Sequence, residues 1–169
     1  MRQASVAQLF EYHRERLQLL RVGGNLDALI AVNHDYASPA DLIGHLNLIH
    51  PDRIQVIGAP EINWAAKQHA VRVSRHMDEI IAAKPPVVIV ADGCAVPASV
   101  REACEKTDTA LFSTPQTAAT VIDLLRIWLS RNFAETTELH AVMMDVLGMG
   151  VLITGDSGVG KSELALELI

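Results

Sequence analysis

Apolar residues recur every three to four positions in several stretches of the chain, a spacing that predicts amphipathic helices. Ser5 and Gln8 have the spacing of a capping box at the start of the first stretch, and Gly23-Gly24 is placed to end it. Pro97 and the Thr114-Pro115 pair are expected to begin the last two helices. The predicted helices cover residues 5–20, 40–49, 60–81, 97–104 and 115–129.

Short apolar segments alternate with these helices and predict strands. Val87–Val90 is a continuous apolar run, which is typical of a strand buried on both faces. From residue 53 onward the predicted order is strand, helix, strand, helix, strand, helix, which favours a parallel sheet because parallel neighbours need a long connection. We therefore expect an α/β fold with a small parallel sheet flanked by helices. The predicted strands are residues 26–32, 53–57, 87–90 and 110–112.

A polar stretch from Asn132 to Glu138 follows the last of these helices. We place a domain boundary there, which gives an N-terminal α/β domain at residues 1–134. Residues 135–169 are interpreted as a linker and the start of a second domain. The second domain is expected to be incomplete, because only eight residues follow Lys161 and a parallel crossover needs a dozen or more.

The second segment contains the pattern of a P-loop. An apolar strand at 151–154 is expected to lead into it, and residues 163–169 are expected to form a helix behind it. Glycines let the backbone curl around a phosphate chain, and the amides from Gly158 to Ser162 would point at it. Lys161 would reach the β- and γ-phosphates, and the Ser162 hydroxyl would bind Mg²⁺. A glycine-rich turn without a ligand is the alternative. The loop consists of Gly155, Asp156, Ser157, Gly158, Val159, Gly160, Lys161 and Ser162.

Composition and charge exclude several other classes of protein. The 14 Lys and Arg residues are outnumbered by 20 Asp and Glu, so the net charge of -6 disfavours a nucleic-acid partner. No apolar run approaches the roughly 18 residues of a membrane span, and the charged N-terminus leaves no signal-peptide core. We expect a cytoplasmic protein. Cys94 and Cys104 lack the spacing of a thiolate zinc site or a disulfide framework.

The order of motifs around the P-loop is more specific than the loop alone. His140 precedes a strand that ends in Asp145, and a Gly-x-Gly turn, a second strand and the P-loop with Glu163 follow. This segment resembles the start of the kinase domain of the HPr kinase/phosphorylase family. The stretch at 52–58, together with Glu61, is similar to that family's N-terminal domain, so the resemblance covers most of the chain.

The resemblance implies a bifunctional enzyme that regulates carbon metabolism. Such an enzyme uses ATP and Mg²⁺ to phosphorylate a serine of HPr, a carrier protein of the sugar phosphotransferase system. It also removes that phosphate by phosphorolysis, in which inorganic phosphate becomes pyrophosphate. The family's roles place His140 and Lys161 at the catalytic centre, Gly155 to Ser162 on the nucleotide and Ser162 on the metal. A homo-oligomer is expected for the full-length protein, and no activity for this chain by itself.

Several alternatives stay open on the sequence. Another P-loop kinase or ATPase would share the loop, and a non-catalytic regulatory or assembly module would describe the N-terminal domain acting alone. Glu163 is placed either near the metal or simply at a helix N-terminus, which a carboxylate favours. Asp92-Gly93 ends a predicted strand, where open α/β sheets often bind ligands, although we favour a plain turn there.

Overall fold

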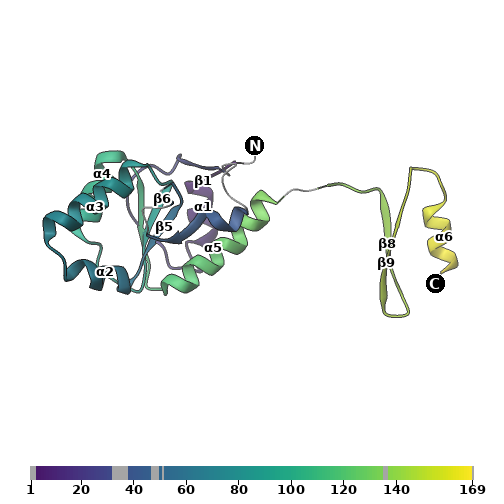
Figure 1. Ribbon diagram of the computed structural model, residues 1–169. Coiled ribbons are helices and arrows are strands. Elements are labelled where there is room, and N and C mark those ends of the chain that lie inside the picture. The colour runs from purple at the N-terminus through teal and green to yellow at the C-terminus, as the bar shows by residue number, and fades with distance from the viewer. Residues whose placement is uncertain (1–2, 32–37, 47–49, 51, 135–136, 169) are drawn as a thin grey trace. The chain divides into compact units, whose positions relative to one another are not determined.

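The computed structural model describes residues 3–31, 38–46, 50, 52–134 and 137–168. The chain divides into two compact units, residues 1–134 and residues 135–169, each with its own contacts (Figure 1). No helix in the described part of the chain is both long and apolar enough to span a membrane.

A five-stranded sheet forms the centre of the first unit, with the strand order β2-β7-β6-β5-β4. The four strands from β4 to β7 run parallel, and β2 pairs antiparallel with β7 at one edge. The α/β class with a parallel sheet is thus confirmed. A separate antiparallel pair joins β1 and β3. The strands are β1 Gln3–Ser5, β2 Leu20–Gly23, β3 Leu29–Ala31, β4 Ile43–His45, β5 Ile54–Ile57, β6 Val87–Val90 and β7 Ala110–Ser113.

Helices cover both faces of this sheet. β6 is apolar at every position, so it presents apolar side chains to both faces and both must be buried. Successive side chains of a strand point to opposite faces. Val87 and Ile89 therefore join the core beneath α1 (Val6–His13) and α5 (Ala118–Phe133), whereas Val88 and Val90 join the core beneath α3 (Ala70–Ala82) and α4 (Ala98–Thr107). All four side chains of β6 are fully buried, as the continuous apolar run predicted. α2 (Ala59–Ala66) lies near α3 and α4 (Figure 1).

Two helix starts show how the local sequence sets the boundaries. The predicted capping box of α1 is present: the Gln8 N–H donates to Ser5 Oγ at 3.2 Å, and the Ser5 N–H donates to Gln8 Oε1 at 2.9 Å. α5 begins later than predicted. Its cap is Thr117, whose Oγ1 accepts the Thr120 N–H at 3.2 Å, and not the Thr114-Pro115 pair.

The helix predicted at residues 5–20 is shorter in the structure. α1 ends at His13, and Gln18 has a left-handed φ of 50° that a continuing helix cannot contain. Leu20, counted as part of the helix, is 66% exposed and begins the edge strand β2. The apolar spacing continued past the helix end because Leu17 and Leu19 are buried in the core from a turn.

The helix predicted at residues 40–49 is wrong for the residues that the structure describes. Residues Pro39–Leu42 form a short 3₁₀ helix, η1, and Ile43–His45 form the strand β4; residues 47–49 lie outside the described range. Ile43 pairs with Ile54 in the parallel ladder between β4 and β5. A three-residue strand carries too little alternation for a sequence pattern to reveal it.

The helix predicted at residues 60–81 is two helices. α2 ends at Ala66 and α3 begins at Ala70. Between them the Gln68 N–H donates to Ala65 O at 3.0 Å, a three-residue step that tightens the last turn. The helix is interrupted where the apolar positions used for the prediction have a gap, between Ala66 and Val73.

The second unit is a β-hairpin followed by a short helix. β8 (Ala141–Val146) and β9 (Met149–Thr154) pair antiparallel, and α6 covers Lys161–Glu167. Leu147 and Gly148, with φ values of 55° and 82°, form the two-residue turn, and the Asp145 carboxylate accepts the Gly148 N–H at 2.8 Å. The strand predicted to end at Asp145 runs one residue further. The last residue of the predicted C-terminal helix, Ile169, lies outside the described range.

Candidate functional site

The loop between β9 and α6 is shaped by glycines with positive φ. Gly155, Gly158 and Gly160 have φ values of 157°, 86° and 88°, a region that other residues rarely adopt. A Cβ at Gly160 would lie only 2.9 Å from Glu163 Oε2, whereas a Cβ at Gly158 would meet nothing within 4 Å. The backbone around Gly158 is therefore open to an approaching group.

Lys161 closes this loop on itself. Its Nζ donates to the carbonyl oxygens of Gly155 at 2.7 Å and Asp156 at 2.6 Å. These bonds join the first residue of α6 to the first two residues of the loop. The hydrogen bonds keep the positive charge of Lys161 beside the loop, where it can attract an anion.

The structure brings His140 to the same place. β8 pairs with β9 so that Ala141 lies opposite Thr154, which puts His140 next to the strand end from which the loop starts. His140 and Lys161 line one cavity of about 370 Å³. Of the predicted loop residues, Gly155, Asp156 and Val159 do not line this cavity. Its walls are His140, Ala141, Val142, Ser157, Gly158, Gly160, Lys161, Ser162 and Glu163.

These residues fit a phosphate group better than a metal ion alone. An ammonium, a hydroxyl and an open glycine backbone surround the cavity, and they are the donors that phosphate oxygens accept from. Within the described ranges no group of three or more His, Cys, Asp or Glu side chains could hold a metal. The Ser162 hydroxyl is one oxygen donor in this wall. Glu163 lies both in the cavity wall and in the first turn of α6, so both of its interpretations stay open.

Asp92 has a role that sequence analysis missed. Its carboxylate accepts the backbone N–H of Ala59 at 2.7 Å and that of Ala118 at 2.9 Å. It thereby satisfies the first amides of α2 and α5 from the end of β6, with a φ of 59° of its own. Asp92 lies in a turn, as the simpler interpretation predicted, and its carboxylate also holds two distant amides that only the structure reveals.

Two further titratable groups are perturbed, both in the first unit. Burial, and then the charge of Arg16, lower the pKa of His13 to about 4, and neither ring nitrogen has a hydrogen-bond partner. Burial, and then Glu105, raise the pKa of Cys104 to about 12, whereas Cys94 is only partly buried. These groups pack the core and do not line the cavity at the loop.

A strand, a loop with the sequence Gly-x₄-Gly-Lys-Ser and a helix are the elements of a P-loop protein. Comparison with known families makes the assignment narrower. Residues 4–129 match the model of the HPr serine kinase N terminus, and residues 131–169 match that of the HPr serine kinase C-terminal domain. The chain belongs to the HPr serine kinase family.

Individual relatives agree with this assignment. The chain is 57% identical over its whole length to proteins named HPr kinase/phosphorylase from Aromatoleum aromaticum and from a species of Azoarcus, covering 54% of each. A Burkholderia cenocepacia protein of the same name is 56% identical over 78% of this chain and 41% of its own length. The chain thus spans about half the length of these curated relatives.

Among solved structures, the CBS and DRTGG regulatory region of Clostridium perfringens pyrophosphatase is 13% identical, with a TM-score of 0.35. The match covers 80% of this chain and 74% of that one. A similarity this low supports no conclusion about fold or function.

Proposed function

We propose that the protein to which this chain belongs transfers phosphate from ATP to a serine of HPr, and that it removes that phosphate with inorganic phosphate. The supporting observation is the loop from Gly155 to Ser162, with the Lys161 ammonium held at its mouth and His140 in the same cavity wall. The relatives' name, HPr kinase/phosphorylase, supports the choice of substrate. HPr as partner, a homo-oligomeric state and a cytoplasmic location stay predictions.

Each residue of the loop has a role in this proposal. The amides from Gly158 to Ser162 bind the β-phosphate, and Lys161 leaves its carbonyl partners to bind the β- and γ-phosphate oxygens. Ser162 binds Mg²⁺, which neutralises charge on the phosphates when it is bound. His140 orients the transferred group or stabilises its charge, because an imidazole can donate a hydrogen bond from either nitrogen. The acidic base and the further metal ligands belong to the part of the relatives that this chain does not span.

One loop can serve both directions because both reactions move a phosphoryl group between two oxygens. In the kinase direction the serine oxygen attacks the γ-phosphorus, its proton passes to the base, and the bond to the β-phosphate oxygen breaks. In the other direction an oxygen of inorganic phosphate attacks the phosphorus of phosphoserine, and the bond to the serine oxygen breaks. The attacking phosphate gives up a proton to the base, the base passes it to the serine oxygen, and the serine leaves as a hydroxyl while pyrophosphate forms. Inorganic phosphate then lies where the β-phosphate of ATP lay.

The proposal is tested with Lys161→Ala in the full-length protein. Both activities should fall by at least about 100-fold, because both lose the same cation from the site of charge development. HPr phosphorylation with ATP and pyrophosphate release from phosphoserine-HPr are measured on one preparation. Lys67→Ala, which removes an exposed lysine from the end of α2, is the control and should leave both rates unchanged. Loss of only one activity in Lys161→Ala would contradict the shared site.

A further inference from the structure

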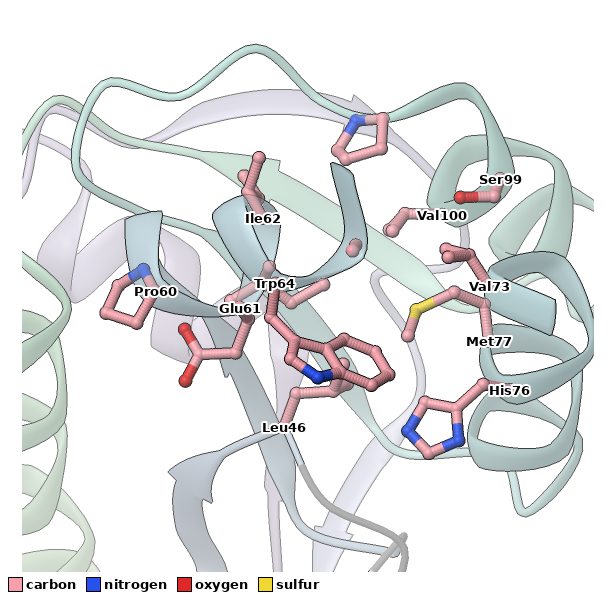
Figure 2. Close-up of a pocket in the computed structure, with 13 residues that line it drawn as sticks. Leu46, Pro60, Glu61, Ile62, Trp64, Val73, His76, Met77, Ser99 and Val100 are labelled. Atoms are coloured by element: carbon pink, nitrogen blue, oxygen red, sulfur yellow. The ribbon is translucent and has the colours of Figure 1, made fainter. Parts of the chain in front are cut away.

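A cavity of about 360 Å³ lies in the first unit, between α2, α3 and the start of α4. It is distinct from the cavity at the P-loop, which lies in the second unit. Figure 2 shows the Trp64 ring of α2 lying toward His76 and Met77 of α3, and Glu61 and Ile62 of α2 line other parts of the same cavity. Trp64 is 45% exposed, and no residue of α2 is fully buried. α2 thus lines a hollow on one side, while its Ile62 packs against the core cluster of this face.

Hydrogen bonds fix the start of α2, the helix that lines one side of this cavity. The Ala59 N–H donates to Asp92 at 2.7 Å, and the Gly58 N–H donates to Glu61 Oε2 at 2.8 Å. These bonds fix the N-terminus of the helix, and Ile62 adds packing against the core. The cavity is open to solvent on one side, and its volume equals that of roughly a dozen waters. An anchored helix above an apolar hollow of this size is typical of a preformed ligand pocket.

The walls of the cavity select the chemistry of its ligand. Most of them are apolar, and Trp64 and His76 present rings whose centroids are 5.9 Å apart. None of the described residues that line the cavity is Lys or Arg, so a phosphorylated or carboxylate ligand would find no ammonium or guanidinium group there. The one carboxylate is that of Glu61. Its Oε1 lies 3.3 Å from His45 Nδ1 and its Oε2 accepts from Gly58, and each oxygen keeps a lone pair for a further donor.

We propose that this cavity is a binding site for a small aromatic amine. The ring packs against Trp64 and Met77, since planar rings and cations both favour the face of an indole and a thioether adapts to an aromatic surface. The protonated amine donates to the Glu61 carboxylate. A ligand of about a dozen non-hydrogen atoms fills the volume. Nothing in this site depends on the P-loop unit.

Tryptamine and indole-3-acetate are the matched probes, because they carry the same ring with opposite charges. The ¹⁵N-labelled 169-residue chain is titrated with each, and the indole N–H signals are assigned with Trp64→Phe. We expect the Trp64 signal to shift saturably with tryptamine at submillimolar Kd, while the signal of the buried Trp128 stays in place. Indole-3-acetate should bind at least tenfold more weakly.

Glu61→Gln tests the carboxylate without breaking the helix cap, because a glutamine oxygen can still accept the Gly58 N–H. It should weaken tryptamine binding five- to tenfold and leave the binding of uncharged indole unchanged. Glu79→Gln, on α3 and outside this cavity, is the control and should alter neither. Equal affinity for the two probes, an unchanged Kd in Glu61→Gln, or no saturable shift at Trp64 would each overturn the proposal.

Discussion

The carboxylate of Asp92 and the backbone N–H of Ala59 are joined at 2.7 Å, although 33 residues separate them in the sequence. The other oxygen of the same carboxylate accepts the N–H of Ala118 at 2.9 Å. One side chain just after β6 therefore positions two helices: α2, which lines the cavity beside Trp64, and α5, which lies on the opposite face of the sheet. The first unit is locked together at this end by a charged group and not by apolar packing alone.

Asp92→Ala should lower the free energy of unfolding by about 2 to 3 kcal/mol. It leaves two helix-terminal amides without their acceptor and puts a Cβ without a compensating hydrogen bond at a φ of 59°. Asp92→Asn should lose less, about 1 to 2 kcal/mol, because its single oxygen still satisfies one amide. Urea unfolding measures both. Asp123→Ala, on the exposed side of α5, is the control, and an equally small effect at Asp92 would contradict its role.

His13 should make the first unit sensitive to acid. Its pKa is about 4 in the folded protein and near 6.5 in the unfolded chain, so the folded state excludes a proton that the unfolded state binds. Stability is complete above pH 6.5 and falls as the pH decreases toward 4, by about 2 kcal/mol between pH 7.5 and pH 5.

The protonation state of His13 is followed directly by NMR of the histidine ring protons. At pH 5 the His13 ring should still be neutral, because its pKa is about 4. His13→Gln assigns the signal. A His13 ring that is already protonated at pH 5 would show that its burial has no electrostatic consequence.

Residues 1–134 should fold without the rest of the chain. Both apolar clusters of the sheet are built from residues up to Phe133, and Ala165 is the one buried apolar residue among those described after it. A protein ending at Ala134 should unfold cooperatively in urea and show near-ultraviolet circular dichroism from the buried Trp128. Aggregation or a featureless spectrum would mean that the boundary lies elsewhere.

The 169-residue chain should not bind Mg-ATP measurably, although it carries the P-loop. Apolar side chains of the hairpin are exposed to solvent: Met143 of β8 is 78% exposed and Leu152 of β9 is 52% exposed. A loop so weakly supported must be ordered by the ligand, at about 1 to 2 kcal/mol for each residue fixed, which exceeds the gain from one lysine and a few charged hydrogen bonds. Isothermal titration calorimetry is the measurement, and micromolar affinity would contradict the expectation.

The sequence by itself determined the features that depend on neighbours in the chain. The β6 run is apolar at every position, so it had to be buried on both faces. The capping box of Ser5 and Gln8 needs only a three-residue spacing, and it is present. The glycines, Lys161 and Ser162 of the loop were likewise evident from their order, because a P-loop is made within one short segment.

Only the tertiary structure decided what depends on distant residues. β2 and β4 are strands because β7 and β5 offer them free edges, and their own three or four residues give no periodic signal. The role of Asp92 follows from two amides, 33 and 26 residues away. The cavity beside Trp64 exists because the predicted single helix breaks after Ala66. A local pattern specifies hydrogen bonds made within a few residues, whereas pairing partners and voids are set by which surfaces meet when the whole sheet is assembled.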